Sequence, residues 1–470
     1  MIKLYNTLGR SKEDFKPIKD GKVKLYTCGP TVYDYAHIGN LRSFIFDDTL
    51  RRMLEFSGCQ VDHVMNITDV GHLSSDADEG DDKLEKGAQR ESKSVWEVAQ
   101  QYIDAFLSDM QDLNVLAPNG NQGTYARATD FIEQQIELVK ILFEKEYAYQ
   151  TDGAIYFDVA KLDYYGKLTG QKLADKEVGA RDEVVVDQEK RHPQDFALWF
   201  FKVGRFADHS MSWHSPWGDG FPGWHLECSA IIHATLGEPI DIHTGGVDHI
   251  GTHHTNEIAQ TEAAYGVKLA NYWLHNEHLL IQNSKMSKSK GNYYTLDDIK
   301  KKSYDPLALR LLFLQSHYRS QSNFSWEALD AAQASLNNFY AWADLRFQNL
   351  VSDKLESNYS EVFGKIVASM ENDLATPDAL GWFNGMIDQA EGLGADSEVI
   401  AKYAKQLDLL LGLGLSDRKD ISDELKSLIK ARETARQAQD WPKADELRRE
   451  LSDKGLELKD TSQGPVWRRG

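Results

Sequence analysis

The sequence predicts an α/β fold: a parallel-sheet domain with an α/β insertion, followed by an α-helical bundle and a small C-terminal α/β module. Three observations support this prediction. A strand, a helix and a second strand follow one another within about 45 residues near the start of the chain, as in the βαβ units of parallel sheets. Long helical periods with almost no strand signal begin near residue 325. The final part of the chain returns to mixed helical and strand patterns.

The first βαβ unit is predicted from residue types and breakers. VKLYTCGPTV (23–32) is a β-rich run broken by Gly29 and Pro30. The periodic segment LRSFIFDDTLRRMLEFSG (41–58) is typical of a helix. VDHVMNIT (61–68) is again β-rich, so we expect two neighbouring parallel strands joined by this helix.

The polar, acidic segment 71–94 is predicted to be a solvated loop. It does not fit a calcium loop: counting from Asp76, the fifth and twelfth positions are Gly80 and Gly87, where oxygen ligands are needed. We favour an inert insertion over a lid for this segment.

Later segments alternate between the two patterns. Residues 95–147 are predicted to be mainly helical, and the β-rich run PIDIHTGG (239–246) leads into a helical pattern at 256–266. Between them, strand-like runs mixed with turn residues indicate a separate α/β insertion. These runs are GAIYFDV (153–159), EVVVD (183–187) and FALWFF (196–201).

Composition excludes several classes of protein. The 470 residues are 41 % hydrophobic, and no run approaches the ~18 apolar residues of a membrane span. The start MIKLYNTLGR lacks a signal-peptide pattern, so we expect a cytoplasmic protein without membrane contact. A formal net charge of −20 argues against non-specific nucleic-acid binding.

Four residues are candidates for a metal site. His253 and Glu257 are four apart in a predicted helix and therefore project from one face. Such a pair is also common as a plain surface hydrogen bond. Two thiolates from Cys28 and Cys228 would complete a tetrahedral zinc shell. A single cysteine is otherwise a small buried hydrophobe, which is our interpretation of Cys59.

One further motif suggests phosphate binding, and a second has no specific meaning when it is considered alone. HIGN (37–40) lies where the first strand gives way to the first helix, so His37 and Gly39 would face a phosphate at the helix amino terminus. KMSKSKGN (285–292) has the composition of a charged turn and is not specific by itself.

Together these motifs resemble the class I aminoacyl-tRNA synthetases, and specifically the cysteinyl-tRNA synthetases. HIGN stands where the family has HIGH, and KMSKS is intact. The resemblance extends over nearly the whole chain, because further family segments occur in the family's order. These are CGPTVYD (28–34), NITD (66–69), PGWHLECSA (222–230), the GG-x-D and HH-x-NE elements (245–257) and DTSQGPVWRR (460–469).

The resemblance implies one zinc ion per chain that binds the substrate thiolate. Its implied ligands are Cys28, Cys228, His253 and Glu257. Since zinc binds a thiolate strongly and an alcohol hardly at all, cysteine would be selected over serine without an editing site.

The resemblance also implies the residues around the substrates. The amino-acid pocket would be formed by Thr68 and Trp224, with His225 and His243 as walls or hydrogen-bond donors. The ATP site and the catalytic residues would comprise His37, Gly39, Asn40, Gly245, Gly246, Asp248, Lys285 and Lys288. Of these, His37, Asn40 and the two lysines would act in catalysis, chiefly by neutralising the triphosphate.

The implied reaction is attack of the cysteine carboxylate on the α-phosphate of ATP, followed by transfer of the cysteinyl group to tRNA(Cys). The implied partners are L-cysteine, ATP with Mg²⁺, and tRNA(Cys), and we expect a monomer. The rival functions are a cysteine ligase of the mycothiol pathway, which has a similar core but no anticodon module, and a catalytically silent paralogue.

The chain departs from the family at several positions. Asn40 replaces the second signature histidine, and Thr244 and Thr252 alter the metal segment without changing its ligands. Asparagine can donate to a phosphate oxygen but has no charge, so nucleotide binding would be weaker or differently tuned.

Six segments follow from these patterns and the resemblance. The first and second halves of a Rossmann-like catalytic domain are expected at 1–125 and 210–270, separated by a connective insertion at 126–209. The remaining segments are a KMSKS-bearing connecting domain (271–330), a helical bundle (331–415) and an anticodon-recognition module (416–470).

Overall fold

The structure is a computed structural model in which the chain forms two compact units, one of residues 1–302 and 318–323 and one of residues 303–317 and 324–470. It describes residues 1–71, 73, 82–120, 123, 125–170, 190–281, 284–286, 292–348, 350, 355–393, 395–461 and 464–469, without the side chains of Lys83, Lys285 and residues 391–393.

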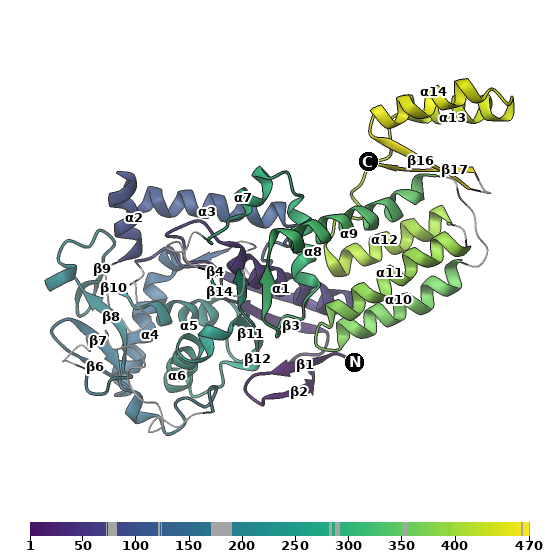
Figure 1. Ribbon diagram of the computed structural model, residues 1–470. Helices are drawn as coiled ribbons and strands as arrows, with labels where there is room; N and C mark the ends of the chain where they lie inside the picture. Colours follow the sequence, from purple (N-terminus) through teal and green to yellow (C-terminus); the bar gives the residue numbers. More distant parts are fainter. Residues whose placement is uncertain are drawn as a thin grey trace. The chain divides into compact units, whose positions relative to one another are not determined.

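The first unit is built around a five-stranded parallel sheet, which confirms the predicted fold class (Figure 1). Its strand order is β12-β11-β3-β4-β5. Because β4 and β5 extend the sheet on one side of β3, and β11 and β12 on the other, the order reverses between β3 and β11. The strands are β3 (Lys22–Thr27), β4 (Gln60–Ile67), β5 (Ala126–Arg127), β11 (Ile240–Gly246) and β12 (Ala270–Asn276).

Helices connect and cover these strands. The predicted β3–helix–β4 unit is present, with α1 at Ile38–Phe56. One face of the sheet packs Tyr26 and Val64 against Ile231 of α5 and Ile258 of α6. Burial of this kind stabilises the fold by about 25 cal/mol per Å² of apolar surface. The connecting helices are α3 (Val95–Asp112), α4 (Ile132–Glu144), α5 (Trp224–Thr235) and α6 (His253–Tyr265).

The insertion forms a separate five-stranded antiparallel sheet of order β6-β7-β8-β10-β9. Two of the predicted runs are strands here, and EVVVD lies outside the described residues. Aromatic residues dominate the core, including the stacked pair Phe157 and Phe196. The strands are β6 (Ala148–Gln150), β7 (Ala154–Phe157), β8 (Phe196–Phe201), β9 (Trp213–Ser215) and β10 (Gly218–Pro222).

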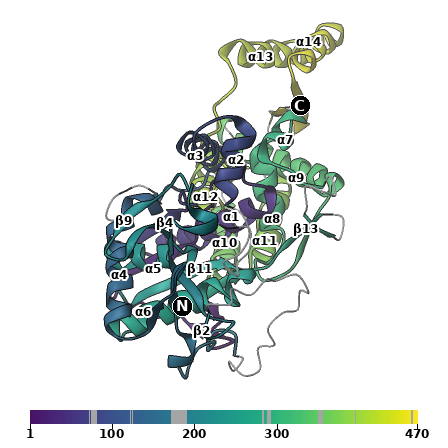
Figure 2. The ribbon, with the colours of Figure 1, turned by 90° about the vertical axis from the view of Figure 1, so that its left-hand side faces the viewer.

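The prediction of a solvated loop at 71–94 was wrong for its second half, which contains helix α2 (Lys83–Glu91). The Asp82 side chain caps this helix by accepting from the backbone N–H of Glu85 at 3.0 Å. Leu84 and Ala88 are buried, and α2 lies beside α3 in Figure 2. Because most residues of this segment are charged or polar, it has few of the apolar positions by which an amphipathic helix is recognised.

Shorter elements complete the first unit. The amino terminus forms an antiparallel hairpin that the sequence patterns did not predict. After β12 the chain forms small strands and one capped helix. These elements are β1 (Lys3–Asn6), β2 (Ser11–Asp14), β13 (Leu279–Ile281), β14 (Ser284–Lys285), β15 (Ser322–Phe324) and α7 (Leu296–Lys301).

The second unit is mainly helical, as predicted from residue 325 onward, and its long helices lie side by side in Figure 1. They are α8 (Pro306–Leu314), α9 (Trp326–Asp344), α10 (Leu355–Glu371), α11 (Thr376–Leu393) and α12 (Ser397–Leu411).

The unit ends in a module of two helices and an antiparallel hairpin. The module has its own core, in which Leu451, Leu458 and Trp467 are buried. Its elements are α13 (Asp423–Gln437), α14 (Trp441–Asp453), β16 (Leu456–Thr461) and β17 (Gly464–Arg469). Across the described residues of both units, no helix is long and apolar enough to cross a bilayer.

Candidate active site at the carboxyl ends of the parallel strands

A cavity of about 610 Å³ opens where the strand order of the parallel sheet reverses. Its walls come from the segments that directly follow β3, β4, β11 and β12. Open parallel sheets bind ligands in this position, because the carboxyl ends of the strands and the amino ends of the helices meet there. The predicted site residues Cys28, His37, Thr68 and Trp224 all line the cavity.

The HIGN motif forms the amino terminus of α1. His37 is the N-cap residue, and its Nδ1 accepts from the backbone N–H of Asn40 at 3.1 Å. In return, Asn40 Oδ1 accepts from the backbone N–H of His37 at 3.2 Å. This reciprocal pair is a capping box, so asparagine at position 40 satisfies one of the helix's unpaired amide donors. Asn40 therefore has a structural role that the sequence did not suggest.

The two glycines that end β11, Gly245 and Gly246, leave room in the same cavity. A Cβ atom on Gly246 would lie 2.4 Å from Asp248 Oδ1, and one on Gly245 would lie 2.7 Å from the rings of His249 and His254. Because real Cβ atoms do not approach other atoms so closely, neither position tolerates a side chain without rearrangement. Both glycines and Asp248 line the cavity.

Four predicted ligands meet at one end of the cavity. The donor atoms of Cys28, Cys228, His253 and Glu257 all lie within 4.8 Å of one another, and all four residues are buried. Two thiols, an imidazole and a carboxylate form a donor set that suits zinc. Cys28, Cys228 and His253 also line the cavity, so a metal held by this group could contact a ligand bound there.

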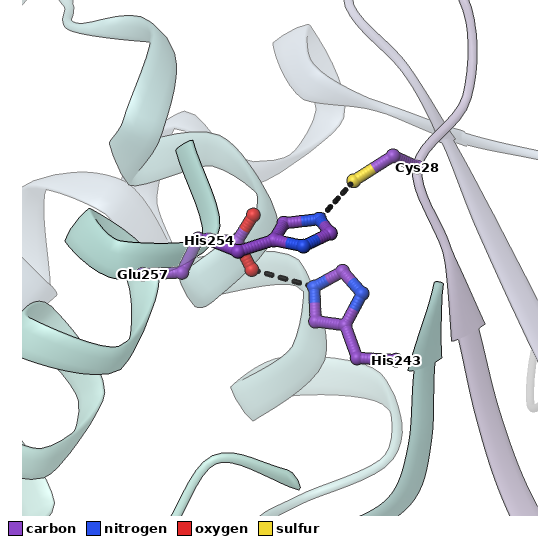
Figure 3. Close-up of side chains that lie close together, drawn as sticks. All are labelled: Cys28, His243, His254 and Glu257. Atoms are coloured by element: carbon purple, nitrogen blue, oxygen red, sulfur yellow. Dashed lines mark hydrogen bonds and ion pairs between the residues drawn. The ribbon is translucent and has the colours of Figure 1, made fainter. Parts of the chain in front are cut away.

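A second group of four shares two of these residues (Figure 3). Cys28, His243, His254 and Glu257 also have donor atoms within 4.8 Å of one another. His254 Nε2 lies 3.3 Å from Cys28 Sγ, and His243 Nε2 lies 2.6 Å from Glu257 Oε2. Through these contacts, His254 restrains the Cys28 thiol and His243 restrains the Glu257 carboxylate.

The pKa values within the first group are shifted in different directions. Burial lowers the pKa of His253, but the charges of Glu257 and Cys228 raise it to about 10. Burial alone would raise the pKa of Cys228, but the hydrogen bond from Cys28 and the charge of His253 lower it to about 6. Burial and the adjacent Cys228 raise the pKa of Cys28 well above its ordinary value. For Glu257, burial is outweighed by His243 and His253, which lower the pKa. One thiolate and one carboxylate are thus available near neutral pH, whereas Cys28 and His253 must each lose a proton before they can bind a metal.

The remaining predicted pocket residues fall into two sets. Thr68 and Trp224 face the cavity, and the Trp224 ring stacks on His253 with centroids 4.4 Å apart. His225 and His243 are fully buried and contact candidate ligands: His225 Nδ1 lies 3.1 Å from His253 Nδ1, and His243 contacts Glu257.

The KMSKS motif is only partly described. Lys285 ends β14, and Met286 lines the cavity 3.5 Å from a Cβ built on Gly39. Lys288 lies outside the described residues.

Sequence reasoning missed three buried residues near the cavity. His254 was passed over beside His253, although the HH pair was visible. His275, whose Nε2 lies 2.8 Å from His254 Nδ1, had no local signal. Glu227 accepts the Thr68 hydroxyl at 2.6 Å, and burial raises its pKa well above the ordinary value. Only its position next to Cys228 could have drawn attention to it.

Comparison with known proteins agrees with this geometry. The family described as the tRNA synthetases class I (C) catalytic domain matches residues 14–334, and the cysteinyl-tRNA ligase anticodon binding domain matches residues 418–468. The chain is 42 % identical to the cysteine–tRNA ligase of Treponema denticola, covering 100 % of this chain and 99 % of that one. It is 41 % identical to the cysteine–tRNA ligase of Clostridioides difficile, with complete coverage of both chains.

Solved structures share the fold at low identity. The methionyl-tRNA synthetase of Mycobacterium tuberculosis with methionyl-adenylate superposes with a TM-score of 0.60 at 14 % identity, covering 84 % of this chain and 92 % of that one. The LeuRS of Agrobacterium radiobacter in a ternary complex gives a TM-score of 0.60 at 12 % identity, with coverages of 87 % and 86 %. From the matched domains and the full-length identity, the chain belongs to the cysteine–tRNA ligase family of class I aminoacyl-tRNA synthetases.

Proposed function

We propose that the protein activates L-cysteine with ATP, releasing pyrophosphate, and transfers the cysteinyl group to tRNA(Cys), releasing AMP. The observation that supports this best is the cavity itself, which is lined both by the HIGN turn and by three of the four buried metal donors, Cys28, Cys228 and His253. A nucleotide at the amino terminus of α1 and a thiol at the metal donors would place their reacting groups between them.

For the metal, we propose one zinc ion held by Cys28, Cys228, His253 and Glu257. The donor chemistry and the burial of the group fit this ion. When bound, zinc supplies a Lewis acid that favours a thiolate over an alcohol, which is the basis for selecting cysteine over serine. His225 and His243 orient His253 and Glu257 through their hydrogen bonds, and such partners typically contribute 10- to 100-fold to affinity.

For the nucleotide, we propose that the chain binds ATP with Mg²⁺ between the α1 amino terminus and the β11 turn. The capping box already uses the backbone N–H groups of His37 and Asn40, so the positive end of the α1 dipole beside Gly39 would stabilise the phosphates. The space beside Gly245 and Gly246 suits adenosine. The KMSKS lysines, Lys285 and Lys288, neutralise the triphosphate, and Asp248 binds the nucleoside.

We propose that residues 416–470 recognise tRNA(Cys), and that the protein acts as a monomer in the cytoplasm. The match to an anticodon binding domain over residues 418–468 favours tRNA over an amino sugar as the acceptor. It therefore weighs against a mycothiol-pathway ligase.

The test is ATP–pyrophosphate exchange on the zinc-loaded protein, with cysteine and serine compared in the absence of tRNA. We expect exchange with cysteine and a rate with serine that is lower by at least about 1,000-fold, because a zinc-bound thiolate has no counterpart in serine. Exchange with neither amino acid would contradict the proposal and favour a silent paralogue.

Two variants, each of which removes one cysteine, test the assignment of the metal ligands. Cys228→Ala should lower zinc content from one ion per chain and abolish cysteine-dependent exchange, because one buried ligand is lost. Cys59→Ala removes a cysteine outside both donor groups and should retain both properties. Full zinc occupancy in Cys228→Ala would refute the ligand set.

A further inference from the structure

A buried carboxylate next to the metal donors has no role in the proposed reaction. Glu227 lies in the first turn of α5, immediately before Cys228, and is only 1 % exposed. A helix amino terminus stabilises negative charge, so this location suits a carboxylate. Its Oε2 accepts the Thr68 hydroxyl at 2.6 Å. Its Oε1 is buried and has no hydrogen-bond partner within the described part of the chain.

Thr68 connects this carboxylate to the cavity. It follows β4, lines the cavity wall and donates its only hydroxyl proton to Glu227. It accepts one bond from Asn66 Nδ2 at 3.2 Å. A hydroxyl oxygen has two lone pairs, so one acceptor position remains on Thr68. With its proton committed to Glu227, Thr68 can offer a ligand only an acceptor.

Two other buried carboxylates near the cavity, Asp69 and Glu257, have partners at both oxygens. Asp69 accepts two bonds from Thr129, at 2.9 and 2.7 Å. Glu257 contacts His243 at 2.6 Å and His253 at 2.7 Å. Glu227 therefore keeps one oxygen, Oε1, without a hydrogen bond within the described residues, and burying such an oxygen is costly. A positively charged ligand group would offset that cost.

We propose that Glu227 is a positioning residue that acts through Thr68 to bind the α-ammonium of the amino-acid substrate. This inference rests on the proposed function and deepens it. The thiol end of the substrate is recognised at the metal donors, and the ammonium end at Thr68 with Glu227 behind it. Since Cys228 and Glu227 are consecutive in α5, one helix turn fixes the spacing between the two ends.

Two analogues of cysteine test the proposal, because each of them lacks one of the two charged groups of cysteine. Cysteamine has the thiol and the ammonium but no carboxylate, whereas 3-mercaptopropionate has the thiol and the carboxylate but no ammonium. Both are used as inhibitors of cysteine-dependent pyrophosphate exchange by the zinc-loaded, full-length protein.

In Glu227→Gln we expect the KM for cysteine and the inhibition constant of cysteamine to rise together by about tenfold or more, because a charge-assisted interaction is lost. The inhibition constant of 3-mercaptopropionate and the zinc content should stay within about twofold of the unaltered protein. Thr68→Val should give the same pattern, and the double variant should be no worse than either single variant, because the two residues act as one unit.

A matched control is Asp241→Asn, which removes another buried carboxylate from the same unit. Asp241 accepts from the backbone N–H groups of Ile18 and Lys24, near the start of β11 and away from the carboxyl ends of the strands. The Asp241→Asn variant should leave the KM for cysteine and the inhibition constants of cysteamine and 3-mercaptopropionate unchanged.

Two results would overturn the inference. Unchanged affinity for cysteine and cysteamine in Glu227→Gln would remove the ammonium role. An equal rise in the inhibition constant of 3-mercaptopropionate would instead indicate a general distortion of the pocket. Failure of the unaltered protein to exchange with cysteine is a different result, because it contradicts the proposed function together with everything that rests on it.

Discussion

Asn40 shows how one residue can serve both the fold and the site. Its side chain closes the capping box with His37, and its backbone N–H is the donor to the His37 ring. The ring orientation of His37 at the cavity thus depends on Asn40. The T-shaped contact between His37 and Tyr293, with centroids 5.4 Å apart, supports the same orientation.

Two substitutions separate these roles of Asn40. Asn40→Ala removes the reciprocal cap and should lower stability by about 1 kcal/mol. Asn40→Asp keeps an acceptor for the His37 N–H and adds negative charge at the helix amino terminus, so stability should be retained. The same charge opposes a triphosphate, and the KM for ATP in pyrophosphate exchange should rise by about tenfold. Unfolding and exchange are measured on both variants. A normal KM for ATP in Asn40→Asp would show that nucleotide phosphates do not approach this helix end.

At the scale of residues, the sequence predicted which side chains lie together when each of them belonged to a local motif. Cys28, Cys228, His253 and Glu257 were predicted as one group from motifs, and their donor atoms do lie together. Glu227 adjoins Cys228 in α5 but contacts Thr68, which follows β4, and His275 at the end of β12 contacts His254 of α6. Their contacts depend on tertiary packing, which no local spacing encodes.

At the scale of elements, α2 is anchored at its first turn to the antiparallel sheet. His209 Nε2 lies 2.9 Å from Asp82 Oδ2, with both side chains buried. The His209 ring stacks on Phe221 of β10 with centroids 4.1 Å apart. Glu85 Oε1 also accepts the backbone N–H of Ser210 at 2.7 Å. Helix α2 in turn packs on α3, whose Tyr102 and Phe106 line the cavity. The second half of segment 71–94 is therefore an integral part of the catalytic unit.

This anchor should make stability depend on pH. Burial lowers the pKa of His209, but its hydrogen bond with Asp82 outweighs burial and raises the pKa above 6.5. A raised folded-state pKa gives a stabilising contribution that is complete below about pH 6.5 and is lost as the pH rises through the folded value. Asp82→Asn keeps an acceptor for the α2 cap but removes the charge, so its loss of unfolding temperature should be larger at pH 6 than at pH 8. An equal loss at both pH values would show that His209 is neutral in the folded protein.

Elements were predictable where their period was long and their caps were clear. The β3, α1 and β4 segments and the helices after residue 325 were predicted, because each has an uninterrupted pattern. The hairpin β1–β2 was missed because SKED in β2 is entirely polar, and an exposed strand has no alternating apolar face. Helix α2 was missed because only Leu84 and Ala88 mark its buried side.

At the scale of the whole molecule, charge is distributed unevenly along the chain. The protein has a formal net charge of −20, yet residues 418–470 contain 13 lysines and arginines and 11 aspartates and glutamates. If residues 416–470 bind tRNA as proposed, a slightly cationic module within an acidic protein would favour RNA contacts in this region over contacts elsewhere. Part of this charge is structural, since Arg418 donates to the buried Asp344 at 2.6 and 2.8 Å.

Removing the module should therefore separate the two half-reactions. A chain that ends at Asp420 keeps the Arg418–Asp344 pair but lacks the hydrophobic core around Leu451. We expect it to support pyrophosphate exchange within about twofold of the full-length protein, whereas kcat/KM for charging tRNA(Cys) should fall by about 100-fold, or about 2.7 kcal/mol. The full-length variant Leu451→Asp disrupts the same core and should reproduce this selective loss. Since the remaining affinity for tRNA would lack the cationic module, it should also depend less steeply on salt. If exchange and charging fell together in both variants, the module would be needed for the integrity of the catalytic unit, and the assignment of tRNA recognition to residues 416–470 would be wrong.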